Sequence, residues 1–224
     1  MIPWELLDSE PIAKSSSVLH LYRRGDEYSI RVDREDLMGS RQHGSEESLA
    51  KISCARIADR AGARVLVGGL GMGFTLRAAL DALSADAEVV VAELSPAVIR
   101  WNQGPLAHLA DHPLADSRVT LKEGDVAKLL RESRGQFDSV LLDVDNGPDG
   151  FTRQSNEWLY GRGGIRASVD SLRKGGVLGV WSAGPDAAFV KRLRKEGLDV
   201  DDLRVPATRS GGGTHTLWIA TPKS

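Results

Sequence analysis

The chain has 224 residues, of which 41% are hydrophobic and 27% are charged, and its formal net charge is -2. These are ordinary values for a globular protein, and the length suits one large α/β domain with a small appendage. The near-neutral charge argues against a nucleic-acid-binding surface, which needs clustered Lys and Arg side chains. The single cysteine, Cys54, excludes an intramolecular disulfide, and its apolar helical setting favours core packing over catalysis.

No apolar run approaches the roughly 18 to 20 residues of a membrane span, and the first residues do not resemble a secretion signal. We therefore expect a cytoplasmic protein with no membrane partner. The five histidines and the single cysteine do not form a recognised metal-ligand motif, so no metal site is predicted.

The N-terminal region is expected to differ from the rest of the chain. Residues 1–17 contain prolines and a serine run, which predict an extended or turn-rich arm. Segments 18–22 and 28–32 alternate apolar and polar residues around a Gly-Asp turn signal, which predicts a small β-hairpin. We expect this arm and hairpin to occupy residues 1–45 and the main domain to occupy residues 46–224.

A helix is predicted to open the main domain. Ser45 precedes Glu46, Glu47 and an apolar-periodic run that continues to Ile57. This pattern predicts Ser45 as the N-cap, with the two acids in the first turn complementing the helix dipole.

From residue 63 onward, strand-like and helix-like segments alternate. Repeated βα units imply a parallel sheet covered on both faces, and the last two strands predict an antiparallel hairpin at its edge. The expected fold class is α/β: a Rossmann-like, doubly wound, mostly parallel sheet with an antiparallel C-terminal edge hairpin, preceded by a small N-terminal β-hairpin. Expected strands lie at 64–67, 88–93, 118–122, 137–143, 177–182, 198–205 and 214–220, and expected helices at 75–83, 95–109, 126–134, 165–172 and 187–196, with Gly175 and Gly176 ending the fourth helix.

The first strand of this domain runs through a glycine-rich turn into a helix. Gly69, Gly71 and Gly73 supply positive φ angles and remove Cβ atoms where a ligand could lie against the backbone. The alternative is that the glycines only let a strand turn into a closely packed helix. Their spacing differs from the dinucleotide fingerprint, and the absence of Gly-Lys-Ser or Gly-Lys-Thr excludes a P-loop.

Polar side chains follow the next three strands, at the edge where a doubly wound sheet binds its ligands. Glu93 ends the second strand, and its carboxylate could accept two hydrogen bonds from a ribose diol, which suits an adenosine-containing cofactor. Asp125 follows the third strand, and Asp143, Asp145 and Asn146 follow the fourth. The acids after the fourth strand could hold a cationic amine and act as a base, or they could form only a solvated acidic loop.

Four blocks of sequence, at 65–73, 89–99, 116–125 and 137–143, together resemble the class I S-adenosylmethionine-dependent methyltransferases. Their order and spacing resemble, more narrowly, the spermidine synthase (polyamine aminopropyltransferase) branch over about residues 28–182. The resemblance implies a transferase that uses S-adenosylmethionine or its decarboxylated form, a small-molecule amine as substrate, and a homodimer.

The resemblance also implies roles for individual residues. Glu93 would bind the ribose hydroxyls, Asp125 would meet the adenine amino group, and Asp143 would accept a proton from the amine or orient it. Asp143 and Asp145 are the expected catalytic residues, and Glu47 and Asn146 are expected to contact the substrate. The residues expected to bind the cofactor are Gly69, Gly71, Met72, Gly73, Glu93, Leu94, Asp125, Val126 and Asp143.

Four positions depart from the family pattern, among them Ser45, where the family has a tyrosine, and Ser95, where an aspartate is usual. Met72 stands where the family has an aspartate in the glycine turn, and Asn146 stands at the family's second aspartate. Three functions therefore stay open at this point: aminopropyl transfer to a polyamine, methyl transfer to an unknown small molecule, and non-catalytic nucleotide binding.

Overall fold

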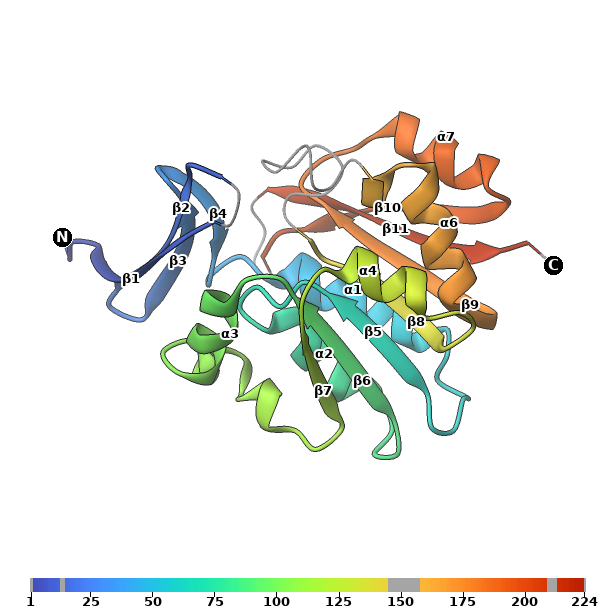
Figure 1. Ribbon diagram of the computed structural model, residues 1–224, viewed down its shortest axis with the longest axis horizontal. Helices are drawn as coiled ribbons and strands as arrows, with labels where there is room; N and C mark the ends of the chain where they lie inside the picture. Colours follow the sequence, from blue (N-terminus) through green and yellow to red (C-terminus); the bar gives the residue numbers. More distant parts are fainter. Residues whose placement is uncertain (1, 13–14, 145–157, 209–212, 224) are drawn as a thin grey trace.

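The larger part of the molecule is built on a seven-stranded sheet, as a computed structural model that describes residues 2–12, 15–144, 158–208 and 213–223 shows (Figure 1). The strand order is β10-β11-β9-β8-β5-β6-β7. The strands are β5 (Arg64–Gly68), β6 (Glu88–Glu93), β7 (Val119–Glu123), β8 (Phe137–Leu142), β9 (Leu172–Ser182), β10 (Leu198–Pro206) and β11 (Thr214–Pro222).

Strands β5 to β9 run parallel, whereas β11 is antiparallel to both of its neighbours, β9 and β10. This arrangement confirms the predicted fold class, with the β10–β11 hairpin at one edge. The chain builds outward from β5 through β6 to β7 and then returns to β8 on the other side of β5. The switch point of the sheet therefore lies between β5 and β8, where such sheets bind ligands.

Helices cover both faces of this sheet because its central strands are apolar on both sides, as every residue of β8 is buried. Helices α1 (Gly44–Ala55), α2 (Phe74–Ala82) and α3 (Pro96–Gln103) pack in one core cluster, together with the 3-10 helix η1 (Ala107–Ala110). Helices α4 (Val126–Glu132), α6 (Arg162–Ser171) and α7 (Ala187–Lys195) pack in a second cluster on the opposite face. A further 3-10 helix, η2 (Pro113–Ala115), precedes β7.

The N-terminal region is a four-stranded antiparallel sheet: the predicted hairpin is confirmed as its two central strands, whereas the predicted arm was wrong because part of it forms an edge strand. Its strands, in spatial order, are β1 (Glu5–Pro11), β2 (Val18–Arg24), β3 (Glu27–Val32) and β4 (Glu35–Gly39). The arm forms β1 because Pro11 stands at the end of an edge strand, where its missing N–H costs no internal ladder bond. The division into two domains at residue 45 stays a prediction.

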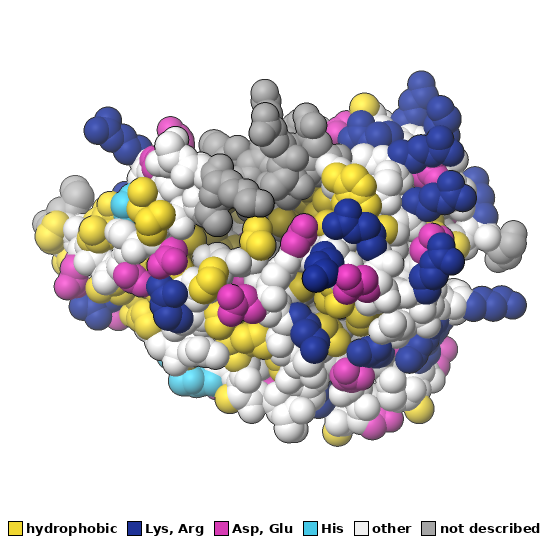
Figure 2. All heavy atoms as spheres, in the orientation of Figure 1, with side chains coloured by type: hydrophobic (Ala, Val, Ile, Leu, Met, Phe, Trp, Pro, Cys, Tyr) yellow, Lys and Arg dark blue, Asp and Glu magenta, His cyan; other side chains and the backbone are white. Residues whose placement is uncertain are grey.

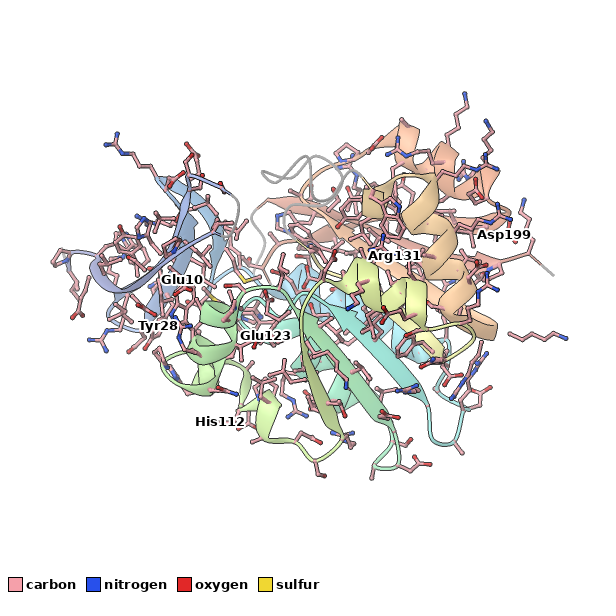
Figure 3. All side chains as sticks on the ribbon, viewed as in Figure 1. Glu10, Tyr28, His112, Glu123, Arg131 and Asp199 are labelled. Atoms are coloured by element: carbon pink, nitrogen blue, oxygen red, sulfur yellow. The ribbon has the colours of Figure 1, made fainter. Side chains whose placement is uncertain are left out.

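The N-terminal sheet docks on α3 and η1. The Trp101 indole N–H donates to Asp8 at 2.7 Å, and this bond is the main cause that lowers the pKa of Asp8. Arg100 pairs with Glu10 at 3.0 Å, and the Tyr28 ring meets His108 edge-on with centroids 5.5 Å apart (Figure 3). The small sheet is therefore joined to the larger part through side chains on both.

One predicted helix end also differs. Gly175 and Gly176, expected to end the fourth helix, lie inside β9, and α6 ends earlier at Ser171. The pairing of β8 with β9 shifts register at this point, and Gly175 has a φ of +70°. The glycines thus accommodate an irregularity in the strand.

Charge is distributed unevenly over the surface. Figure 2 shows Lys and Arg side chains gathered over the end of the molecule that carries α6 and α7. On α7 the exposed cations include Lys191 and Lys195, while Phe189 and Leu193 are buried against the sheet. Helix α7 thus exposes cations on one face and buries apolar side chains on the other. In the part of the chain that the structure describes, no helix has the length and apolar character needed to cross a bilayer.

Gly69 should be indispensable to the fold. Its φ is +90°, and a Cβ placed there would lie 2.2 Å from the Asp143 carbonyl oxygen. Gly69→Ala should therefore lower the free energy of unfolding by about 2 kcal/mol or more. Gly184→Ala, where a Cβ would meet no atom within 4 Å, is the matched control. Equal urea midpoints for the two variants would contradict this account.

Candidate active site

The carboxyl ends of β5, β6, β7 and β8 form one edge, as the sequence predicts, and backbone hydrogen bonds continue past them. The Gly69 N–H donates to the Ala92 carbonyl at 2.9 Å, and the Asp143 N–H donates to the Gly68 carbonyl at 2.9 Å. Glu123, labelled in Figure 3, ends β7 opposite Glu93. The glycine turn after β5 and the residues that follow β6, β7 and β8 therefore lie at one edge of the sheet.

The glycine turn has the backbone conformation that the sequence predicts. Gly69, Gly71 and Gly73 all have positive φ angles, of 90°, 51° and 84°. Each also lies against other atoms: a Cβ at Gly71 would meet the Met38 sulfur at 3.0 Å, and one at Gly73 would meet a Pro113 carbon at 3.0 Å. Close packing, the alternative explanation, thus accounts for part of the pattern.

The Met72 side chain points from the glycine turn into the apolar core. The side chain is fully buried and belongs to the apolar core cluster. The Met72 thioether is therefore part of the core and is not presented to a ligand. Asn102 supports the same turn by donating from Nδ2 to the Gly71 carbonyl at 2.8 Å.

Glu93 lies between two backbone donors. One carboxylate oxygen accepts from the Leu70 N–H at 2.9 Å and the other from the Ser95 N–H at 2.7 Å. A carboxylate offers about four lone-pair directions, so ribose hydroxyls could bind beside these two bonds. The bond from Leu70 also ties Glu93 to the glycine turn.

The rim next to Glu93 carries an unusual apolar side chain. Leu94 is 66% exposed, although large apolar side chains are normally covered. A Cβ on nearby Gly124 would meet no atom within 4 Å, so this rim is open. Asp125 is exposed and caps α4 by accepting from the Ala127 N–H at 2.8 Å, whereas Val126 is buried. The cap explains Asp125 without a ligand, but the exposed Leu94 has no such explanation.

The two aspartates of the β8 segment have opposite electrostatic settings. Burial alone would raise the pKa of Asp138, but the Arg64 N–H and the guanidinium groups of Arg60 and Arg173 hold it below its usual value. Burial raises the pKa of Asp143 to about 6, and the hydroxyl of Thr75, 2.5 Å away, only limits the rise. Asp138 is thus a paired structural acid, whereas Asp143 is a half-buried acid that pairs with no Lys, Arg or His among the described residues.

Glu46 is the site residue that the sequence did not indicate. It is only 3% exposed, and burial, followed by the charge of Asp143, raises its pKa to about 8. The two carboxyl groups titrate together, so at neutral pH the pair carries about one negative charge. The available signal was helical spacing, since Glu46 precedes buried Leu49, Ala50 and Ser53 by three, four and seven residues.

Glu47, the expected substrate contact, is paired with two cationic or polar side chains of its own helix region. Its carboxylate lies 2.8 Å from the His43 ring and 2.8 Å from the Lys51 ammonium. The predicted N-cap was also wrong: α1 begins at Gly44, and the Ser45 hydroxyl turns inward to Glu46 instead of to the first-turn N–H groups.

Asp145 and Asn146, expected to act in catalysis and substrate binding, lie outside the described residues. Within the described ranges, no group of three or more His, Cys, Asp or Glu side chains could hold a metal ion.

Asparagine substitution should have opposite effects on stability at Asp138, within β8, and at Asp143, which follows it. Because the pKa of Asp143 is raised, its ionisation costs stability increasingly from about pH 4 to pH 6. Asp143→Asn should therefore raise the free energy of unfolding at pH 7.5 by on the order of 2 kcal/mol, and by nothing at pH 4. Asp138→Asn should lower it by on the order of 2 kcal/mol at pH 7.5, because two guanidinium groups lose their partner. Urea unfolding that destabilised both variants alike would refute the contrast.

Comparison with known proteins identifies the fold of the chain. No protein-family model matches the chain, and no curated protein matches it in sequence. Among solved structures, the spermidine synthase from Thermotoga maritima matches with a TM-score of 0.77 at 17% identity, over 97% of this chain and 72% of that one.

Two further solved structures agree. A spermidine synthase in complex with the transition-state analogue AdoDATO matches with a TM-score of 0.75 at 17% identity, over 97% of this chain and 72% of the other. A probable spermidine synthase from Corynebacterium glutamicum ATCC 13032 matches with a TM-score of 0.67 at 14% identity, over 98% and 80%. The chain therefore has the spermidine synthase-like fold, with the methyltransferase-type sheet and the additional N-terminal sheet.

Proposed function

We propose that this chain is a spermidine synthase-like transferase that uses decarboxylated S-adenosylmethionine to alkylate an amine. The observation that carries the proposal is the acid pair beside the glycine turn, the buried Glu46 and the half-buried Asp143. Within the described residues, neither carboxylate forms an ion pair with Lys, Arg or His. Buried acids of this kind are costly, and a cationic ligand would supply the missing charge.

The remaining side chains suit an adenosine cofactor. Glu93 would accept the ribose hydroxyls, exposed Leu94 would be covered by the adenine ring, and Asp125 would meet the adenine amino group. The fold neighbour that binds AdoDATO, a transition-state analogue, supports a cofactor of this class.

The proposed chemistry requires little of the protein beyond positioning and proton removal. The substrate ammonium first loses a proton to Asp143, and its nitrogen then attacks the aminopropyl carbon bonded to the sulfonium. An N–C bond forms, the C–S bond breaks, and sulfur keeps the electron pair. The products are 5′-methylthioadenosine, the enlarged amine and one proton.

Further residues would act on the amine side. In this proposal Asp145 is a second catalytic acid, and Asn146 and Glu47 contact the substrate. Glu47 would do so while holding His43 and Lys51. A homodimer and a cytoplasmic location belong to the same proposal.

Methyl transfer from S-adenosylmethionine is the second candidate. The observation in its favour is Met72, whose buried side chain offers no carboxylate at the position where the resembling family has one. A nucleotide-binding protein without catalysis is the third.

Titration calorimetry with decarboxylated S-adenosylmethionine, S-adenosylmethionine and 5′-methylthioadenosine tests the proposal. We expect the decarboxylated form to bind more tightly than S-adenosylmethionine. The opposite preference would favour methyl transfer, and binding of none of the three would refute both enzyme functions.

Two variants of the same strand test the role of Glu93. Glu93→Gln should weaken 5′-methylthioadenosine binding about 10- to 100-fold, because hydrogen bonds to a charged acceptor contribute about 1.5–3 kcal/mol. Glu88→Gln, at the other end of β6, should leave the affinity unchanged. Equal affinities would remove Glu93 from the cofactor site.

A further inference from the structure

The Ser45 hydroxyl has three hydrogen-bonding neighbours. Its oxygen lies 2.5 Å from a Glu46 carboxyl oxygen, 2.8 Å from Nδ1 of His215 and 2.9 Å from Nε1 of Trp181. Ser45 is fully buried, and Glu46 and Trp181 are nearly so, whereas His215 is half-buried on β11. The hydroxyl therefore connects the acid pair to a side chain nearer the solvent.

The number of protons restricts how these bonds can be made. The Trp181 indole can only donate, so it occupies one lone pair of the Ser45 oxygen. The hydroxyl has one proton, which it can give to Glu46 or to His215 but not to both. Whichever group does not receive that proton must donate one to Ser45. The protonation of Glu46 and the tautomer of His215 are thus linked.

We propose that Glu46, Ser45 and His215 form a proton relay between the acid pair and the solvent side of β11. Glu46 gives its proton to the Ser45 oxygen while the Ser45 proton passes to Nδ1 of His215. The resulting imidazolium then loses its Nε2 proton to water. The net result is one proton moved from Glu46 to solvent, a carboxylate at Glu46 and His215 in the Nδ1–H tautomer.

The surroundings favour this direction of transfer. Burial lowers the pKa of His215, so its imidazolium releases a proton readily. The residues that β9 and β10 place against His215 are the uncharged Trp181 and Val205. The titratable groups that face Glu46 are Asp143 at the end of β8, Glu47 on its own helix and, through Ser45, His215. Burial, and after it the charge of Asp143, raises the pKa of Glu46 and so keeps a proton on it until a cation enters the site.

The relay deepens the proposed function and rests on it for its purpose. Alkylation of an ammonium releases one proton into a buried site, and a cationic substrate beside Asp143 and Glu46 would favour the charged form of Glu46. Ser45 and His215 would then act through Glu46 as positioning residues, without touching the substrate.

The tautomer of His215 tests the relay without any ligand. In protein labelled with 15N-histidine, long-range 1H–15N spectra distinguish the Nδ1–H and Nε2–H forms, and His215→Asn assigns the signals. We expect the Nε2–H form at pH 6 and the Nδ1–H form at pH 10, with the change centred near pH 8 where Glu46 ionises. His108, far from Glu46 in sequence and packed on Tyr28, serves as the internal reference.

Two variants should abolish the change of the His215 tautomer with pH. Glu46→Gln cannot ionise and Ser45→Ala removes the shared proton, so in both the His215 tautomer should not change near pH 8. A native spectrum without the change, or the same change in Glu46→Gln, would overturn the relay. If the tautomer changes as expected but no nucleoside binds in calorimetry, the relay stands and the proposed function fails.

Discussion

The contact between β5 and the end of β8 positions the rest of the site. Asp143 donates its N–H to the Gly68 carbonyl, and its own carbonyl oxygen leaves no room for a Cβ on Gly69. This close approach occurs at the switch point of the sheet, where the glycine turn begins. It fixes the Asp143 carboxyl group under Thr75 and near Glu46, in surroundings that raise the pKa of both acids.

The aspartates at the two ends of the β8 segment have opposite electrostatic settings. Asp138 near its amino end is held by Arg60 and Arg173, which compensate for its burial. Asp143, after its carboxyl end, accepts from the Thr75 hydroxyl, and within the described ranges no Lys, Arg or His pairs with it. Buried acids whose pKa values are raised in this way are costly to the fold, and such costs concentrate at functional sites. The site therefore favours a ligand that brings positive charge.

Much of the fold could be predicted because βα alternation and glycine-rich turns are local patterns. The edge strand β1 could not, because its polar, proline-containing sequence becomes a strand only by pairing with β2. Within the site, Asp143 and Glu93 could be placed because they follow strands. Glu46 was attributed to the helix dipole, although its spacing to Leu49 and Ala50 puts it on the buried face.

The Ser45 network could not be predicted from any local pattern. Its hydroxyl joins Trp181 and His215, which are 136 and 170 residues away in sequence. The sheet brings them together because β9 and β11 are neighbours and α1 packs across both. Contacts of this kind depend on tertiary structure.

The nucleoside product distinguishes aminopropyl transfer from methyl transfer. The protein would be incubated with equal amounts of decarboxylated S-adenosylmethionine and S-adenosylmethionine together with a diamine, and the products analysed by mass spectrometry. The account predicts 5′-methylthioadenosine and a diamine enlarged by one aminopropyl group, with loss of product in Asp143→Asn. Formation of S-adenosylhomocysteine and a methylated amine in their place would contradict it.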